Sequence, residues 1–222
     1  MWYFYKMGCG GFTKAMKFAS RWKADRVALW GCLYFFAAFP VAELLPAWAG
    51  WENGPLEIAQ DIILLAGAMD CLVRFRKADR RDHRGLWLGG SAYFLLLLGR
   101  ELSWGRVFLQ KAMTSSGPVF VSMHDLPHSE IVYGMIAVAV LLTGWSLAVY
   151  MPWRSLFEKM PVPALSLLLM IAAAVFASLG DKGFLLGGDF DEILEEEMEL
   201  LVYLLNIHWV HWYDREWECA DG

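Results

Sequence analysis

The sequence predicts an all-α, polytopic bundle of about six transmembrane helices with both termini in the cytoplasm, and three observations support this. The 222-residue chain is 58% hydrophobic, with 12 Trp and 14 Phe, whereas soluble domains average about 45–50% apolar residues. Its apolar residues gather in stretches long enough to cross about 30 Å of hydrocarbon. Its Lys and Arg residues gather between alternate stretches. The charged fraction of 19% is too low for a disordered chain.

The apolar stretches are each about 20 residues long, the length of a membrane-spanning helix. The second and sixth stretches carry several acidic residues. We retain them as spans because, without them, the loops rich in Lys and Arg would not all lie on the same side of the membrane. Five spans is the alternative count. In chain order the stretches are 27–48, 56–73, 86–109, 131–151, 163–179 and 190–213.

The distribution of basic residues predicts the orientation. Of the 19 Lys and Arg, only Lys111 and Lys182 fall in the loops of one side, and Arg100 and Arg106 fall in the third stretch. The others precede the first stretch, separate the second from the third, follow the fourth, or lie in the tail. Short basic loops stay cytoplasmic, so we expect a multi-pass protein of the bacterial inner (cytoplasmic) membrane.

Three segments follow from this topology. Residues 1–26 predict a basic interfacial segment on anionic lipid, with an ordinary positively charged flank as the alternative. Residues 27–213 form the six-helix domain, and 214–222 a cytoplasmic tail. The four cysteines show no CxxC pair or disulfide framework. Because topology explains the basic clusters, no nucleic-acid partner is expected.

Ionisable residues of the predicted spans gather in their outer halves. A charge at the centre of a membrane helix costs about 2.5–3.5 kcal/mol, so each one needs a partner, a cavity or a function. In the last span, six polar residues fall on one face about 100° wide: Glu192, Glu195, Glu196, Glu199, Tyr203 and Asn206. Glu197 lies off this face and is expected to point toward lipid headgroups. For residues 191–195, an acidic first turn that complements the helix dipole is the alternative.

The second and third spans add polar residues at the same depth. One face of the second span carries Glu57, Gln60 and Asp61. In the third span, Arg100 and Glu101 lie about two-thirds of the way across. Arg100 and Arg106 are natural counter-ions, because Arg stays charged and binds carboxylates bidentately. We call this predicted group the acidic pit; a purely structural ion network is the alternative.

Two histidines, His124 and His128, lie in the loop above the acidic pit. Neutral imidazole together with carboxylate oxygens suits Zn, Mn or Fe. The sequence therefore offers four candidate ligands for a divalent metal, Glu101, Glu199, His124 and His128. A surface position for each histidine, and neutralisation of the carboxylates by protons, are the alternatives.

Two motifs resemble a family of uncharacterised bacterial multi-pass inner-membrane proteins. They are Glu52-Asn53-Gly54-Pro55-Leu56-Glu57 and Gly99-Arg100-Glu101-Leu102-Ser103-Trp104-Gly105-Arg106. That family carries an acidic-Gly-x-x-Glu opening, a Gly-Glu-Glu-Ile-Ser-Trp-Gly-Gln-Arg motif, a loop with Asn and His, and a Glu-rich final helix. The chain departs from the family at Arg100 and Arg106, where the family has Glu and Gln. The resemblance implies Glu57, Glu101, Ser103, Trp104, Glu196 and Glu199 as family positions, and no activity.

These patterns lead to one favoured function and two alternatives. The favoured one is a metal-dependent membrane enzyme acting on a lipid-linked or periplasmic substrate. Its candidate catalytic residues are Glu101, Glu196, Arg100 and Arg106. Its candidate substrate-binding residues are Glu57, Asp61, Trp104 and Tyr203. The alternatives are an accessory subunit that meets a membrane-protein partner or a second copy of itself, and an ion or proton transporter.

Overall fold

The structure, a computed structural model, describes residues 26–114, 117–126, 128–158, 160 and 162–221. It is predominantly helical, as the sequence predicts. The predicted interfacial segment 1–26 lies outside the described residues except for Arg26. The long helices are α2 (Arg26–Leu44), α3 (Pro55–Lys77), α4 (Arg81–Glu101), α5 (Ser129–Tyr150), α7 (Ala164–Asp181) and α8 (Asp189–Asp221).

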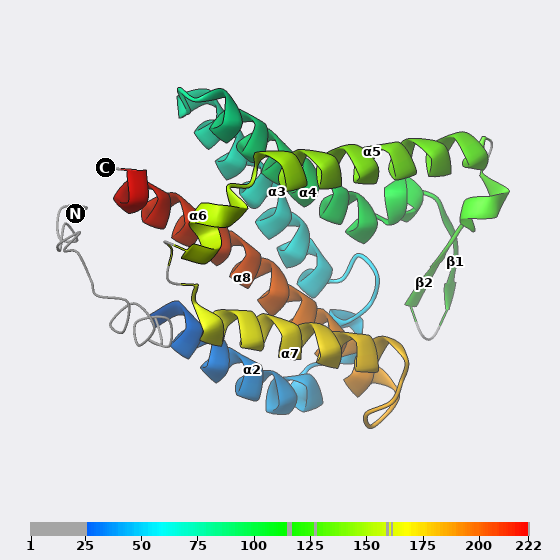
Figure 1. Ribbon diagram of the computed structural model, residues 1–222. Helices are drawn as coiled ribbons and strands as arrows, with labels where there is room; N and C mark the ends of the chain where they lie inside the picture. Colours follow the sequence, from blue (N-terminus) through cyan, green and yellow to red (C-terminus); the bar gives the residue numbers. More distant parts are fainter. Residues whose placement is uncertain (1–25, 115–116, 127, 159, 161, 222) are drawn as a thin grey trace.

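Short elements connect these helices. The 3₁₀ turns are η1 (Ala47–Ala49), η2 (Ser103–Phe108) and η3 (Met123–Asp125), and α6 (Trp153–Glu158) is a short helix. Strands β1 (Gln110–Thr114) and β2 (Gly117–Phe120) form an antiparallel hairpin. We call the end of the bundle beside this hairpin the hairpin end, and the end at which α8 finishes the C-terminal end (Figure 1).

Three of the described helices, α2, α5 and α7, are long and apolar enough to cross a membrane. Each overlaps one of the predicted spans over most of its length. Helices α3, α4 and α8 overlap the other three predicted spans and carry more charged residues. The third span was expected to continue to Leu109, but α4 ends at Glu101 and the 3₁₀ turn η2 follows it, with positive φ at Trp104 and Gly105.

Helix α8 is the centre of the bundle. It packs against α2, α3 and α7, and Figure 1 shows it running between these neighbours. At 33 residues it is the longest described helix, about 50 Å at 1.5 Å per residue. It continues beyond Tyr213 to Asp221, so the predicted tail extends this helix.

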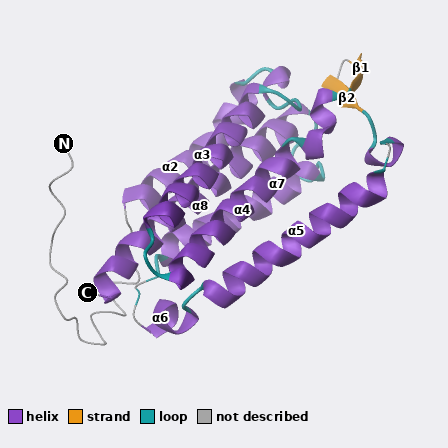
Figure 2. Cartoon of the chain, turned by 90° about the horizontal axis from the view of Figure 1, so that it is seen from above, coloured by secondary structure: helices purple, strands orange, loops and turns teal. Residues whose placement is uncertain are grey.

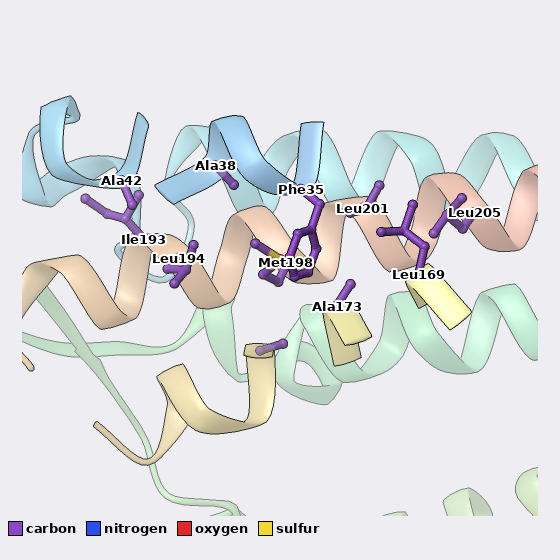
Figure 3. Close-up of a cluster of buried hydrophobic side chains, with 11 residues drawn as sticks. Phe35, Ala38, Ala42, Leu169, Ala173, Ile193, Leu194, Met198, Leu201 and Leu205 are labelled. Carbon is purple, nitrogen blue, oxygen red and sulfur yellow. The ribbon is translucent and has the colours of Figure 1, made fainter. Parts of the chain in front are cut away.

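The core between α2, α7 and α8 is apolar and closely packed. Phe35, Leu169 and Met198 are buried in it, and Figure 3 shows side chains from the three helices meeting there. Gly31 allows the close approach of α2, because a Cβ atom at this position would lie 2.7 Å from Leu169 Cδ2. A second core joins α3, α4 and α8, where Gly67 faces the ring of Phe94 in the same way.

Helix α5 packs chiefly on α4 and lies beside the remaining bundle (Figure 2). The contact is closest at Gly85 and Gly89, which face Tyr150 and Ser146, and the Ser146 hydroxyl donates to the Gly85 carbonyl at 3.1 Å. Thr143 is the one buried residue of this fully described helix. Most of its large apolar side chains are exposed, as expected of a surface that contacts lipid.

The β-hairpin was not expected from the sequence, which predicts only a loop between the third and fourth spans. Its Gly117 has φ +115°, and a Cβ atom there would lie 3.2 Å from the indole of Trp51. The hairpin therefore closes over the loop between η1 and α3. Figures 1 and 2 show it at the opposite end of the bundle from the last turns of α8.

Candidate functional site

The site begins where α4 ends. After Glu101, the backbone of Ser103, Trp104 and Gly105 takes positive φ values, which cannot continue an α-helix. The indole of Trp104 folds back over Gly99, where a Cβ atom would lie 2.6 Å from Trp104 Cζ3. This turn fixes Arg100 and Glu101 on the last turn of α4, beside α8.

Four side chains from α4 and α8 form a connected polar network. Arg100 forms an ion pair with Glu199, and its Nη1 donates to the Tyr203 hydroxyl at 3.2 Å. The Tyr203 hydroxyl donates in turn to Glu101 Oε1 at 2.6 Å. Arg100 Nη1 also lies 3.5 Å from Glu101 Oε1. Tyr203 is 2% exposed. Its hydroxyl therefore bridges the Arg100 guanidinium and the Glu101 carboxylate, which lie farther from each other than Arg100 lies from Glu199.

A cavity of about 330 Å³ opens beside this network. Its charged lining comprises Arg100, Asp181, Glu195 and Glu199, and its remaining wall comprises Tyr203, Ala174, Ala177, Ser178 and Val202. Within the described residues, neither Asp181 nor Glu195 forms an ion pair. The wall thus holds three carboxylates against one guanidinium, which is already paired. We call this cavity with its lining the carboxylate site.

Glu196 lies on the α3 side of α8. Gln60 is fully buried, and its Nε2 donates to Glu196 Oε2 at 2.7 Å and to the Glu196 carbonyl at 2.9 Å. The carboxylate of Glu196 is close enough to those of Glu57, Glu101 and Glu199 for electrostatic repulsion. The structure therefore brings the predicted carboxylates together around α8, with Glu196 outside the cavity lining.

The other predicted substrate-binding and catalytic residues lie outside the cavity lining. Glu57 accepts a hydrogen bond from the Asn53 backbone N–H and so caps the start of α3. Asp61 is half-buried on α3. Arg106 donates to the Ser103 carbonyl at 3.2 Å and, in the part of the chain described, forms no ion pair with a carboxylate of the acidic pit. Trp104 packs on Gly99.

The predicted metal ligands are not gathered. His124 is exposed, with its ring beside Tyr133, and His128 is exposed at the first turn of α5 with φ +62°. Among the described residues, no three His, Cys, Asp or Glu side chains are arranged to hold a metal ion. Neither histidine therefore joins Glu101 and Glu199 in a ligand group, and a bound divalent metal stays a prediction without support from this geometry.

Two acidic residues have partners that the sequence did not indicate. Glu197 was expected to point toward headgroups, and this was wrong: it is buried and accepts a hydrogen bond from Tyr34 on α2. Asp191 accepts from the backbone N–H groups of Leu185 and Leu186, at 3.1 and 2.9 Å, and so orders the loop before α8. Both residues stabilise the fold and do not face the cavity.

Along α8, no Asp, Glu, Lys or Arg lies between Glu199 and Asp214. Asn206 accepts from the Tyr93 hydroxyl at 3.2 Å, and the next charged group is the cluster in which Arg74 contacts Asp70, His211 and Asp214. Between them lies a second cavity with an almost wholly apolar lining. This cavity therefore separates the charged groups at the two ends of the bundle among the described residues.

Comparison with known proteins gives no relative: no family model, curated protein or solved structure matches the chain. The resemblance to a multi-pass inner-membrane family stays a prediction from two motifs.

Proposed function

We propose that the chain is a six-helix protein of the inner membrane, with both termini cytoplasmic and the hairpin end outside, that binds an amphiphilic ligand by its positively charged head. The carboxylate site holds the head, and the ligand's apolar part lies toward lipid. The charge of the cavity wall is the observation that carries this proposal, because Asp181 and Glu195 line the cavity without ion pairs among the described residues.

Electrostatics favours a cationic head. A carboxylate that loses contact with water needs a cation or a proton for compensation, and Arg100 is already engaged by Glu199. The small side chains of Ala174, Ala177 and Ser178 leave room on the α7 side for an alkylated ammonium group. An anionic head would face three carboxylates and is disfavoured.

The position of the cavity favours a ligand that arrives through the bilayer. The cavity lies between α7, α8 and the end of α4, and α5 packs chiefly on α4 and leaves the flank of α7 uncovered. Figure 2 shows α5 apart from α7. A lateral entry suits the lipid-linked class of substrate that the sequence predicts. The apolar cavity farther along α8 disfavours ion or proton conduction, because its lining has no charged side chain.

Binding of matched amphiphiles tests the proposal. The full chain is reconstituted in zwitterionic nanodiscs and titrated with radiolabelled decyltrimethylammonium, with decyl phosphate and decyl glucoside as chain-matched anionic and neutral probes. We expect saturable binding of the cation, at least about tenfold tighter than of the other two, since one charge-assisted contact contributes about 1.5–3 kcal/mol.

Substitutions locate the binding. Glu195→Gln and Asp181→Asn should each weaken decyltrimethylammonium binding about tenfold. The matched control is Glu192→Gln, an exposed carboxylate one turn earlier on α8 that does not line the cavity, and it should leave the affinity unchanged. Equal affinity for the three probes, or unchanged binding in Glu195→Gln, would contradict the proposal. Displacement of the cation by Zn²⁺ or Mn²⁺ alone would favour the metal alternative.

A further inference from the structure

From the second cavity, we infer a separate binding site for a neutral quinone ring near the C-terminal end of the bundle. The cavity has a volume of about 190 Å³ and lies between α4, α5, α6 and α8. It shares no lining residue with the carboxylate site. The inference is therefore independent of the proposed function.

The lining excludes charged ligands and favours a flat ring. It contains no charged side chain, and its aromatic walls are Trp87, Tyr93, Phe94, Trp209, Trp212 and Tyr213. Transfer of an ion into such surroundings is unfavourable, whereas aromatic rings pack well by stacking or edge contacts. An apolar cavity of about 150 Å³ is already sufficient for one benzene ring, so this cavity accommodates a substituted six-membered ring.

Two hydrogen-bond donors in this lining have no partner among the described residues. They are the Tyr213 hydroxyl and Trp209 Nε1, both buried atoms. The whole Tyr213 side chain is buried, with its residue 6% exposed, and its ring is held between Trp87 and Trp217. The amide of Asn206 is already used, because its Nδ2 donates to the Val202 carbonyl and its Oδ1 accepts from Tyr93.

These donors select the ligand chemistry. Buried donors are nearly always satisfied in proteins, and an indole N–H can only donate. The missing groups are therefore acceptors on an uncharged ring, and a quinone supplies two carbonyl oxygens. A lipid acyl chain would fill the volume and leave both donors unsatisfied. Water would find few of the polar partners that an ordered water needs.

The neighbouring helices provide a route from the bilayer. Leu147 of α5, Met151 directly after α5 and Leu156 of α6 form one wall, and α5 exposes most of its apolar surface. The isoprenoid tail of a membrane quinone can remain in lipid while the ring enters between α5 and α8. This requires only binding, with no redox step.

Fluorescence titration tests the inference on the full chain in detergent. A short-tail benzoquinone with one isoprene unit serves as the probe, since quinones quench indole fluorescence on contact. Three of the twelve Trp residues, Trp87, Trp209 and Trp212, line the cavity. We expect saturable partial quenching, and co-purification of quinone detected by solvent extraction and chromatography.

Four variants distinguish the ring site from a general apolar site. Tyr213→Phe and Trp209→Phe should each raise the Kd about tenfold, and Val210→Phe should abolish binding by filling the cavity. Tyr150→Phe is the control, because Tyr150 packs on Gly85 outside this lining. Because Trp209→Phe removes one of the fluorescent indoles, its Kd is measured by equilibrium dialysis with the same quinone.

Three results would overturn the inference: absence of saturable binding, unchanged Kd in both donor variants, or displacement of the quinone by a chain-matched fatty alcohol with equal affinity. The last result would assign the cavity to lipid tails. Size-exclusion profiles establish that each variant is folded. If Tyr213→Phe fails to fold, Trp209→Phe decides the matter, because Trp209 is only partly buried and its loss disturbs the core less.

Discussion

Tyr203 is the residue on which the geometry of the carboxylate site depends most. Its hydroxyl donates to Glu101 and accepts from Arg100, so one side chain fixes a carboxylate of α4 and the guanidinium that pairs with α8. The ring is buried, and its position is therefore set by packing before any ligand arrives. Preorganised polar groups of this kind bind without a large ordering cost.

Removal of this hydroxyl should weaken the fold measurably. Tyr203→Phe leaves the buried Glu101 carboxylate short of a donor, and we expect a loss of about 1–3 kcal/mol in the free energy of unfolding. Reversible unfolding in mixed detergent micelles measures it. Tyr133→Phe is the control, because Tyr133 is exposed. A similar change in the two variants would mean that the hydrogen bond at Glu101 contributes nothing.

The helical periodicity of the sequence predicted which residues of α8 share a face, but it could not predict their partners on other helices. It correctly places Glu195, Glu199 and Tyr203 on one face of the last span, because i, i+4 and i+8 residues align on a helix. It cannot show that Tyr34 of a distant helix would satisfy Glu197. Nor can it show that Trp104 would fold onto Gly99, since that requires positive φ values at non-glycine residues.

At the scale of elements, the contact between α4 and α5 depends on two glycines. A Cβ atom at Gly85 would lie 2.5 Å from Tyr150 Cδ2, and one at Gly89 would lie 2.8 Å from the Ser146 hydroxyl oxygen. Small residues at such crossings let membrane helices approach closely. This contact holds α5 to the bundle and thereby forms one wall of the apolar cavity.

An added methyl group at this crossing should therefore destabilise the protein. Gly85→Ala places a carbon against an aromatic ring that is packed in place, and we expect a loss of about 1–3 kcal/mol in unfolding free energy. Gly144→Ala is the matched change on α5, where nothing lies within 4 Å. It should be neutral or stabilising by up to about 1 kcal/mol, because alanine favours helix. Thermal unfolding in detergent compares them, and equal losses would show that the α4–α5 contact is unimportant.

The sequence predicted the long helices better than the connections. Each of the six apolar stretches overlaps a long helix, because burial in lipid or in the bundle requires a continuous apolar run. The third stretch was expected to reach Leu109, but its helix ends at Glu101. The hairpin could not be predicted, since the strand Gln110–Thr114 is exposed throughout and shows no apolar alternation. The continuation of α8 past Tyr213 was also missed, because the final turns are polar and resemble a tail.

At the scale of the whole molecule, the two cavities lie toward opposite ends of the bundle. The basic residues Arg26, Arg74, Arg80 and Arg154 belong to the C-terminal end of the bundle, opposite the hairpin. With this end in the cytoplasm, as we propose from the rule that basic loops stay there, the carboxylate site would lie in the outer half of the membrane and the apolar cavity in the inner half. The side of the membrane from which each proposed ligand arrives depends on this orientation.

Site-directed cysteine labelling tests the orientation most directly. The native cysteines Cys9, Cys32, Cys71 and Cys219 are replaced by Ser, and single cysteines are introduced by His124→Cys, at the exposed hairpin end, and Arg80→Cys, between α3 and α4. Intact spheroplasts are treated with a membrane-impermeant maleimide. We expect labelling at position 124, and labelling at position 80 only after the membrane is opened; the reverse pattern would overturn the proposed orientation.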